Sequence, residues 1–132
     1  MIVQRLLPLA FPAAGTAACV TLSRLGAPLL RAHDACTFLT RLRGLHGVPP
    51  LGPTDALLLR PCRAVQTFGM RTPIDVAFVD ADGVVLKVVT LAPGRIAGCV
   101  RAKAAVEMRA GTASRMQLAP GQTLVRSTGD RS

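Results

Sequence analysis

Aromatic side chains are scarce in this chain of 132 residues, which has four phenylalanines and neither Trp nor Tyr. Half of the residues are nevertheless hydrophobic, so the core must consist mainly of aliphatic side chains. Proteins that bind single-stranded nucleic acid stack bases on exposed aromatic rings beside positive charge. The four phenylalanines lie in apolar segments that are typical of a core, so we expect no direct binding to nucleic acid.

Acidic residues are also few, with seven Asp and Glu against sixteen Lys and Arg, which gives a net charge of +9. Such a charge favours an anionic partner, which could be nucleic acid, a membrane surface or an acidic protein. The arginines are scattered from Arg5 to Arg131 without a run of four. This scatter also fits the simpler interpretation that they only solvate the surface.

Closely spaced metal ligands are missing. The chain contains four cysteines and no C-x-x-C motif: Cys19, Cys36, Cys62 and Cys99. Zinc sites usually show local ligand pairs, and here only His33 lies near Cys36. We therefore expect no metal, no cofactor and no structural disulfide, with Cys36 and Cys62 as small buried hydrophobes.

Motifs for nucleophilic or phosphate chemistry are absent as well. The sequence has no G-x-S-x-G motif and no Gly-rich phosphate loop. Cys62 could act as a nucleophile only if His33 or His46 approached it in space, and a buried cysteine is the simpler interpretation.

No long hydrophobic run is present, because Pro8, Pro12 and Gly15 interrupt the apolar segment 6–20. Residues 1–19 form either a signal segment or an irregular extension. We expect the extension, and therefore a cytoplasmic location; export through a signal segment is the alternative.

Short apolar segments separated by turn residues make up most of the remaining chain. Gly83 in Asp80-Ala81-Asp82-Gly83 predicts a hairpin turn, and the two aspartates are expected to form local Asx hydrogen bonds rather than a calcium site. After an N-cap at Asp34, residues 35–43 predict a short helix. The predicted strands are 20–24, 28–32, 56–59, 74–79, 84–91, 104–110 and 122–125.

This pattern predicts a mainly β (α+β) fold: a small, compact, barrel-like domain of short, mostly antiparallel strands with one early short helix. We expect a single domain over residues 20–125 and a flexible tail over 126–132. In the strand at 104–110, Ala104, Val106, Met108 and Ala110 are expected to be buried, with Glu107 on the other face. Residues 93–98 are expected to form a loop, and residues 111–116 a turn or a single helical turn.

Residues 61–80, PCRAVQTFGMRTPIDVAFVD, resemble the central signature of a bacterial and archaeal family known as domain of unknown function 192. The resemblance covers residues from about 20 to 124 in the family's order, although Gln66 stands where this branch of the family often has His. Its further segments are 41–45, 57–59, 82–83, 106–111 and 118–122. Because the family has no assigned activity, the resemblance implies a fold and not a function.

Arg71, Asp75 and Glu107 are polar residues in otherwise apolar segments that match the family. They form either a ligand-binding pocket or an internal ion pair with backbone caps, and we favour the structural role. We therefore expect a non-enzymatic small binding or accessory module, with a protein partner in an envelope or secretion assembly. The alternative is a small enzyme that uses Arg71 with Asp75 or Glu107.

Overall fold

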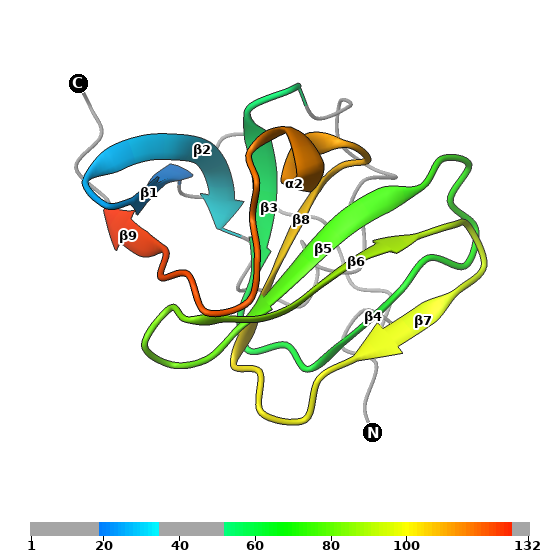
Figure 1. Ribbon diagram of the computed structural model, residues 1–132. Coiled ribbons are helices and arrows are strands. Elements are labelled where there is room, and N and C mark those ends of the chain that lie inside the picture. The colour runs from blue at the N-terminus through cyan, green and yellow to red at the C-terminus, as the bar shows by residue number, and fades with distance from the viewer. Residues whose placement is uncertain (1–18, 35–51, 128–132) are drawn as a thin grey trace.

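A computed structural model describes residues 19–34 and 52–127 (Figure 1). The elements are β1 (Cys19–Arg24), β2 (Ala27–Asp34), β3 (Asp55–Leu59), β4 (Ala64–Gln66), β5 (Ile74–Val79), β6 (Val85–Leu91), β7 (Ile96–Gly98), β8 (Ala104–Arg109), α2 (Thr112–Arg115) and β9 (Val125–Ser127). The helix predicted at 35–43, most of the extension 1–19 and the tail from residue 128 lie outside the described residues.

The main sheet has seven strands in the order β6-β5-β8-β3-β2-β1-β9. Strands β2 and β3 are parallel, and the other neighbouring strands are antiparallel. The prediction of a mainly β fold with mostly antiparallel strands is therefore confirmed.

A closed barrel is not confirmed, because the described strands β6 and β9 remain the edges of the main sheet. The segment that precedes β9 nevertheless lies beside the start of β6. The backbone N–H of Val85 donates to the carbonyl of Gln122 at 2.7 Å. The backbone N–H of Leu124 donates to the carbonyl of Gly83 at 2.8 Å. The last strand lies at Val125–Ser127, three residues later than the start we predicted.

Strands β4 and β7 form a second, two-stranded sheet, which we call the small sheet. It lies apart from the plane of the main sheet in Figure 1. Strand β4 was not predicted, and the prediction of a loop over all of residues 93–98 is wrong, because β7 occupies Ile96–Gly98. Each of these strands has only three residues, too few to show an alternating hydrophobic pattern.

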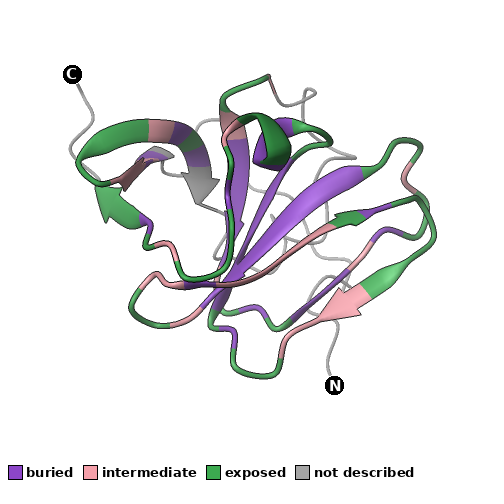
Figure 2. Cartoon of the chain, in the orientation of Figure 1, coloured by how far each residue is buried: buried purple, intermediate pink, exposed green. Residues whose placement is uncertain are grey.

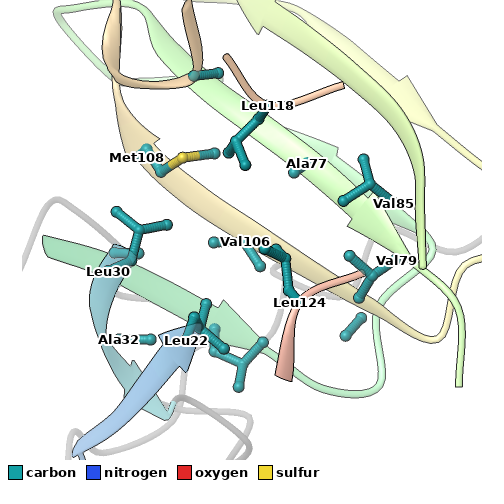
Figure 3. Packing of buried hydrophobic residues seen from close by; sticks show 14 of the residues in the cluster. Leu22, Leu30, Ala32, Ala77, Val79, Val85, Val106, Met108, Leu118 and Leu124 are labelled. Atoms are coloured by element: carbon teal, nitrogen blue, oxygen red, sulfur yellow. The ribbon is translucent and has the colours of Figure 1, made fainter. Parts of the chain in front are cut away.

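The central strands β3, β5 and β8 are buried on both faces (Figure 2). One face contributes to the inner core, the cluster lined by every strand of the main sheet except β9 (Figure 3). Its larger members are Val20, Leu22, Leu30, Leu58, Val79, Val85, Val106, Met108, Leu118 and Leu124. Ala110, which we expected to be buried with them, is exposed, because β8 ends at Arg109.

The opposite face of the central strands contributes to the outer core, which consists of Leu57, Leu59, Cys62, Val65, Ile74, Val76, Phe78, Leu91, Ala102 and Ala105. The small sheet covers this face, with Val65 of β4 buried in the outer core and Ala97 of β7 packed against it. Covering both faces explains why β5 is apolar at nearly every position instead of alternating with polar residues.

The hairpin between β5 and β6 has the geometry that the sequence predicted. Gly83 has a φ of +85°, and a Cβ at this position would lie 2.2 Å from the carbonyl oxygen of Leu124, so only glycine fits. The Asp80 carboxylate accepts hydrogen bonds from the backbone N–H groups of Asp82 and Val84 at 2.8 and 3.0 Å. The predicted local Asx bonds of Asp80 are therefore confirmed.

Candidate functional site

Asp75 on β5 serves the fold. Its side chain is 2% exposed, and its carboxylate accepts a hydrogen bond from the Thr90 hydroxyl at 2.6 Å. It also accepts hydrogen bonds from the backbone N–H groups of Gly111 and Ala113, both at 2.9 Å. Gly111 is the N-cap residue of α2, and as a glycine it has no side chain that could cap the helix. The Asp75 carboxylate on β5 supplies the cap instead, because it accepts hydrogen bonds from the N–H groups at the start of the helix.

Glu107 on β8 is completely buried, but it lies on the other face of the main sheet. The strand register places Glu107 opposite Val76, and Asp75 opposite Met108. Since side chains alternate along a strand, Glu107 faces the outer-core side with Val76, whereas Asp75 faces the inner-core side. The two carboxylates cannot form a paired acid and base.

Arg71 lies in the exposed segment between β4 and β5. Within residues 19–34 and 52–127, its side chain forms no hydrogen bond or ion pair. The structure therefore does not bring Arg71, Asp75 and Glu107 together into one cluster. The expected internal ion pair between Arg71 and Asp75 is absent from the described part of the chain.

A cleft of about 1090 Å³ lies beside the edge strand β6. Three segments line it: the connection after β3, the middle of β6, and the connection between β7 and β8. The lining residues are Pro61, Cys62, Arg63, Leu86, Lys87, Gly98, Cys99, Val100, Arg101, Ala102 and Lys103. Every charged residue among them is positive, and we call this feature the basic cleft.

Backbone hydrogen bonds hold the walls of the basic cleft in place. The N–H of Cys99 donates to the carbonyl of Arg63 at 2.9 Å, and the N–H of Cys62 donates to the carbonyl of Lys103 at 3.2 Å. The N–H of Lys103 in turn donates to Val79 at the end of β5, at 2.8 Å. The cations are thus presented by segments that are bonded to each other and to the main sheet.

The four cations of the basic cleft differ in their surroundings. Lys87 is half-buried, and its Nζ donates to the carbonyl of Gly98 at 2.9 Å, which links β6 to β7. Arg63, Arg101 and Lys103 are exposed. In the described part of the chain, the side chains of these three form no hydrogen bond or ion pair, so their charges can be used by a ligand.

Two cysteines, Cys62 and Cys99, lie in the wall of the basic cleft, and neither forms a disulfide within the described residues. Cys62 is completely buried and its thiol donates to the carbonyl of Ala64 at 3.1 Å, which confirms the predicted burial. Cys99 is half-buried. The side chains of Cys19 and His33, and the whole of Cys36 and His46, lie outside what the structure describes, so an approach of either histidine to Cys62 stays untested.

A smaller cavity of about 370 Å³, beside the β5–β6 hairpin, provides a contrast. Arg60, Lys103 and Arg126 line it together with Asp80 and Asp82, so its charges are mixed. An excess of arginine in the chain therefore does not make every cavity purely basic, and the charge of the basic cleft is a specific feature of that cleft.

Neither a metal centre nor a spanning helix is found among the residues that the structure describes. No group of three or more His, Cys, Asp or Glu side chains there could hold a metal ion. None of the helical structure in that part is long and apolar enough to cross a membrane.

The basic cleft was not predicted, although the sequence contains one sign of it. Residues 84–103 contain Lys87, Arg95, Arg101 and Lys103 and no acidic residue. Only the folded chain shows that three of these, together with Arg63 from a distant segment, surround one hollow.

Two solved structures resemble the chain closely in fold. A protein of unknown function from Novosphingobium aromaticivorans DSM 12444 aligns with a TM-score of 0.71 and 18% identity over 95% of this chain and 97% of that protein. A protein described as a putative transcription regulator from Sinorhizobium meliloti 1021 aligns with a TM-score of 0.69 and 20% identity over 91% and 98%. At these identities the likeness shows the fold alone.

No significant match to a curated protein was found. The family model described as Uncharacterized ACR (DUF192) matches residues 22–125, which is most of the chain and includes both the central strands and the basic cleft. The chain therefore belongs to the DUF192 family, as its central signature indicated.

Proposed function

We propose that this protein is a small non-enzymatic binding module whose basic cleft receives anionic groups of a partner. The observation that supports this proposal is the composition of the cleft. Arg63, Lys87, Arg101 and Lys103 supply four positive charges, and none of the described residues that line the cleft is acidic. Like charges around one hollow repel each other, so a bound anion would relieve that repulsion and gain Coulomb energy from several cations at once.

The dimensions of the basic cleft suit a ligand of moderate size. Small-molecule sites usually enclose about 300–1,000 Å³, and this cleft, at about 1090 Å³, lies just above that range. Leu86 and the exposed Val100 add apolar surface to the same cleft. A peptide segment that carries carboxylates, or a small molecule with several acidic groups, matches this combination of charge and apolar surface.

A protein partner with an acidic segment is the ligand that we favour, and an envelope or secretion assembly is one setting for it. Nucleic acid fits less well, because the described residues that line the cleft include no aromatic ring on which a base could stack. An enzyme that uses Arg71 with Asp75 or Glu107 fits less well, because Arg71 is exposed whereas both carboxylates are buried, on opposite faces of the main sheet.

The test is a calorimetric or NMR titration of the full chain with a hexameric glutamate peptide and, separately, with inorganic pyrophosphate. We expect binding that weakens as salt is added. The double variant Arg101→Glu and Lys103→Glu should weaken it by roughly tenfold or more, because two attractive contacts become repulsive.

The matched control is the double variant Arg31→Glu and Arg109→Glu, which changes the net charge by the same amount at exposed positions outside the basic cleft. It should retain most of the affinity. An equal loss in both double variants would show that overall charge, and not the cleft, attracts the anion.

A further inference from the structure

The end of the small sheet opposite to the basic cleft forms a well-defined tip, made of residues 67–73 and 92–96. Thr67 is completely buried there. Its hydroxyl donates to the carbonyl of Ala92 at 2.7 Å and accepts a hydrogen bond from the N–H of Arg95 at 2.9 Å. The backbone N–H of Thr67 also donates to Arg95 at 2.8 Å. The two loops therefore lie side by side (Figure 1) and form one ordered surface.

This tip exposes large apolar side chains. Phe68 is 57% exposed and Ile96 is 54% exposed, although the chain has only four aromatic residues. Neither side chain belongs to the inner or the outer core. Exposed apolar groups that add nothing to the core indicate a contact with something outside the molecule when they gather at one place.

The charges at the same tip are all positive. Arg71 and Arg95 are both exposed, and segments 67–73 and 92–96 contain no acidic residue. In the part of the chain that is described, the side chains of both arginines form no hydrogen bond or ion pair. Two apolar side chains and two available cations thus share the exposed surface of one tip.

We propose that this tip docks on an anionic lipid surface, with Phe68 and Ile96 entering the boundary between headgroups and acyl chains. Arg71 and Arg95 then contact lipid phosphates, because guanidinium groups bind phosphate oxygens with paired hydrogen bonds. This combination of apolar anchors and cations is how peripheral proteins bind membranes, where neither component alone is sufficient.

A lipid surface fits the tip better than a protein partner or a nucleic acid does. Among the described residues, Phe68, Ile96, Arg71 and Arg95 line neither the basic cleft nor the cavity beside the β5–β6 hairpin, so neither of these hollows offers the tip a pocket for a partner's side chain. A single exposed ring offers little stacking for nucleic acid. The net charge of +9 adds attraction to an anionic bilayer over the whole molecule.

The first experiment is co-sedimentation of the full chain with vesicles of phosphatidylcholine and phosphatidylglycerol in a 7:3 ratio, compared with vesicles of phosphatidylcholine alone. We expect binding to the anionic vesicles only. Arg71→Gln with Arg95→Gln should weaken it by about 25-fold, because each cation near the surface contributes a factor of about five. Phe68→Ser with Ile96→Ser should weaken it by at least about tenfold.

Matched controls remove the same groups elsewhere. Arg31→Gln with Arg109→Gln removes two exposed arginines, and Leu25→Ser with Val125→Ser removes two exposed apolar side chains. Both controls should bind the anionic vesicles within about threefold of the unmodified protein. Thermal melts of all variants should be unchanged, because every substituted side chain is exposed.

The absence of tryptophan permits a second measurement. Phe68→Trp introduces a single fluorophore, whose emission should shift to the blue on anionic vesicles and should be quenched by brominated lipid. Val125→Trp, at a comparably exposed site, should show neither change.

Three results would overturn the proposal: equal binding to neutral vesicles, binding unaffected by the tip variants, or no response from Trp at position 68. Binding lost only with Arg101→Glu and Lys103→Glu would also overturn it, because the basic cleft would then be the membrane contact. A failure of peptide binding at the cleft would leave this proposal standing, since the two sites share no residue.

Discussion

The main sheet and the small sheet differ in almost every physical property. The central strands β3, β5 and β8 are buried on both faces. The small sheet has two strands of three residues each, and it carries exposed hydrophobic and basic side chains at both of its ends. The buried strands of the main sheet therefore contribute most to stability, whereas the candidate binding surfaces lie at the two ends of the small sheet.

The difference follows from how each sheet is covered. A strand that is covered on both faces tolerates polar groups only when they are satisfied, as Asp75 is by its three hydrogen bonds. The small sheet places Val65 and Ala97 against the outer core. Beyond these contacts both ends expose side chains to solvent, so these side chains are available for contacts outside the molecule.

Phe78 and Phe68 allow the sharpest test of this comparison. Phe78 on β5 is completely buried in the outer core, so Phe78→Ala should lower the free energy of unfolding by about 3–5 kcal/mol. Phe68→Ala at the tip should lower it by less than about 0.5 kcal/mol. Urea denaturation of the two variants measures both changes, and similar losses would mean that the tip also supports the core.

Asp75→Ala should produce the next largest effect, a loss of about 3 kcal/mol. The substitution leaves the N–H groups of Gly111 and Ala113 and the hydroxyl of Thr90 without their acceptor, and unsatisfied buried groups are costly. Asp75→Asn retains the shape and one acceptor, so it should cost less than Asp75→Ala. Thermal or urea denaturation distinguishes the two variants, and a stability equal to the unmodified protein would refute the capping role.

Arg71→Ala should have the smallest effect on folding, below about 0.5 kcal/mol, because its exposed side chain has no hydrogen bond or ion pair within the described residues. A double-mutant cycle with Asp75→Ala should give a coupling energy below about 0.5 kcal/mol. A coupling energy above about 1 kcal/mol would show that Arg71 and Asp75 form the ion pair that the sequence suggested.

Much of the main sheet could be predicted because local patterns and tertiary environment agree there. The strand at Ile74–Val79, the turn around Gly83 and the short helix after Gly111 were expected and are present. The expectation that Arg71 and Asp75 interact was based on their place in apolar segments that match the family. It is not met in the described part of the chain, because Arg71 lies before β5 begins and is exposed, whereas Asp75 is buried within the strand.

Periodicity alone also could not find the candidate sites. The strands β4 and β7 are too short to show a pattern, and they are stabilised by pairing with each other across about thirty residues of sequence. The basic cleft combines Arg63 with Lys87, Arg101 and Lys103. No motif connects these positions, because the strand pairing brings them together and their spacing in the chain does not.

The amino-acid sequence by itself determined that this protein has an aliphatic core, a mainly β fold, a strong positive charge and membership of the DUF192 family. These properties depend on composition, on local periodicity and on ordered motifs. Only the tertiary structure decided which polar residues support the fold and where the positive charge is concentrated. Whether a side chain is buried, capped or left facing an open cleft depends on segments that are distant in sequence, and those contacts exist only once the strands have paired.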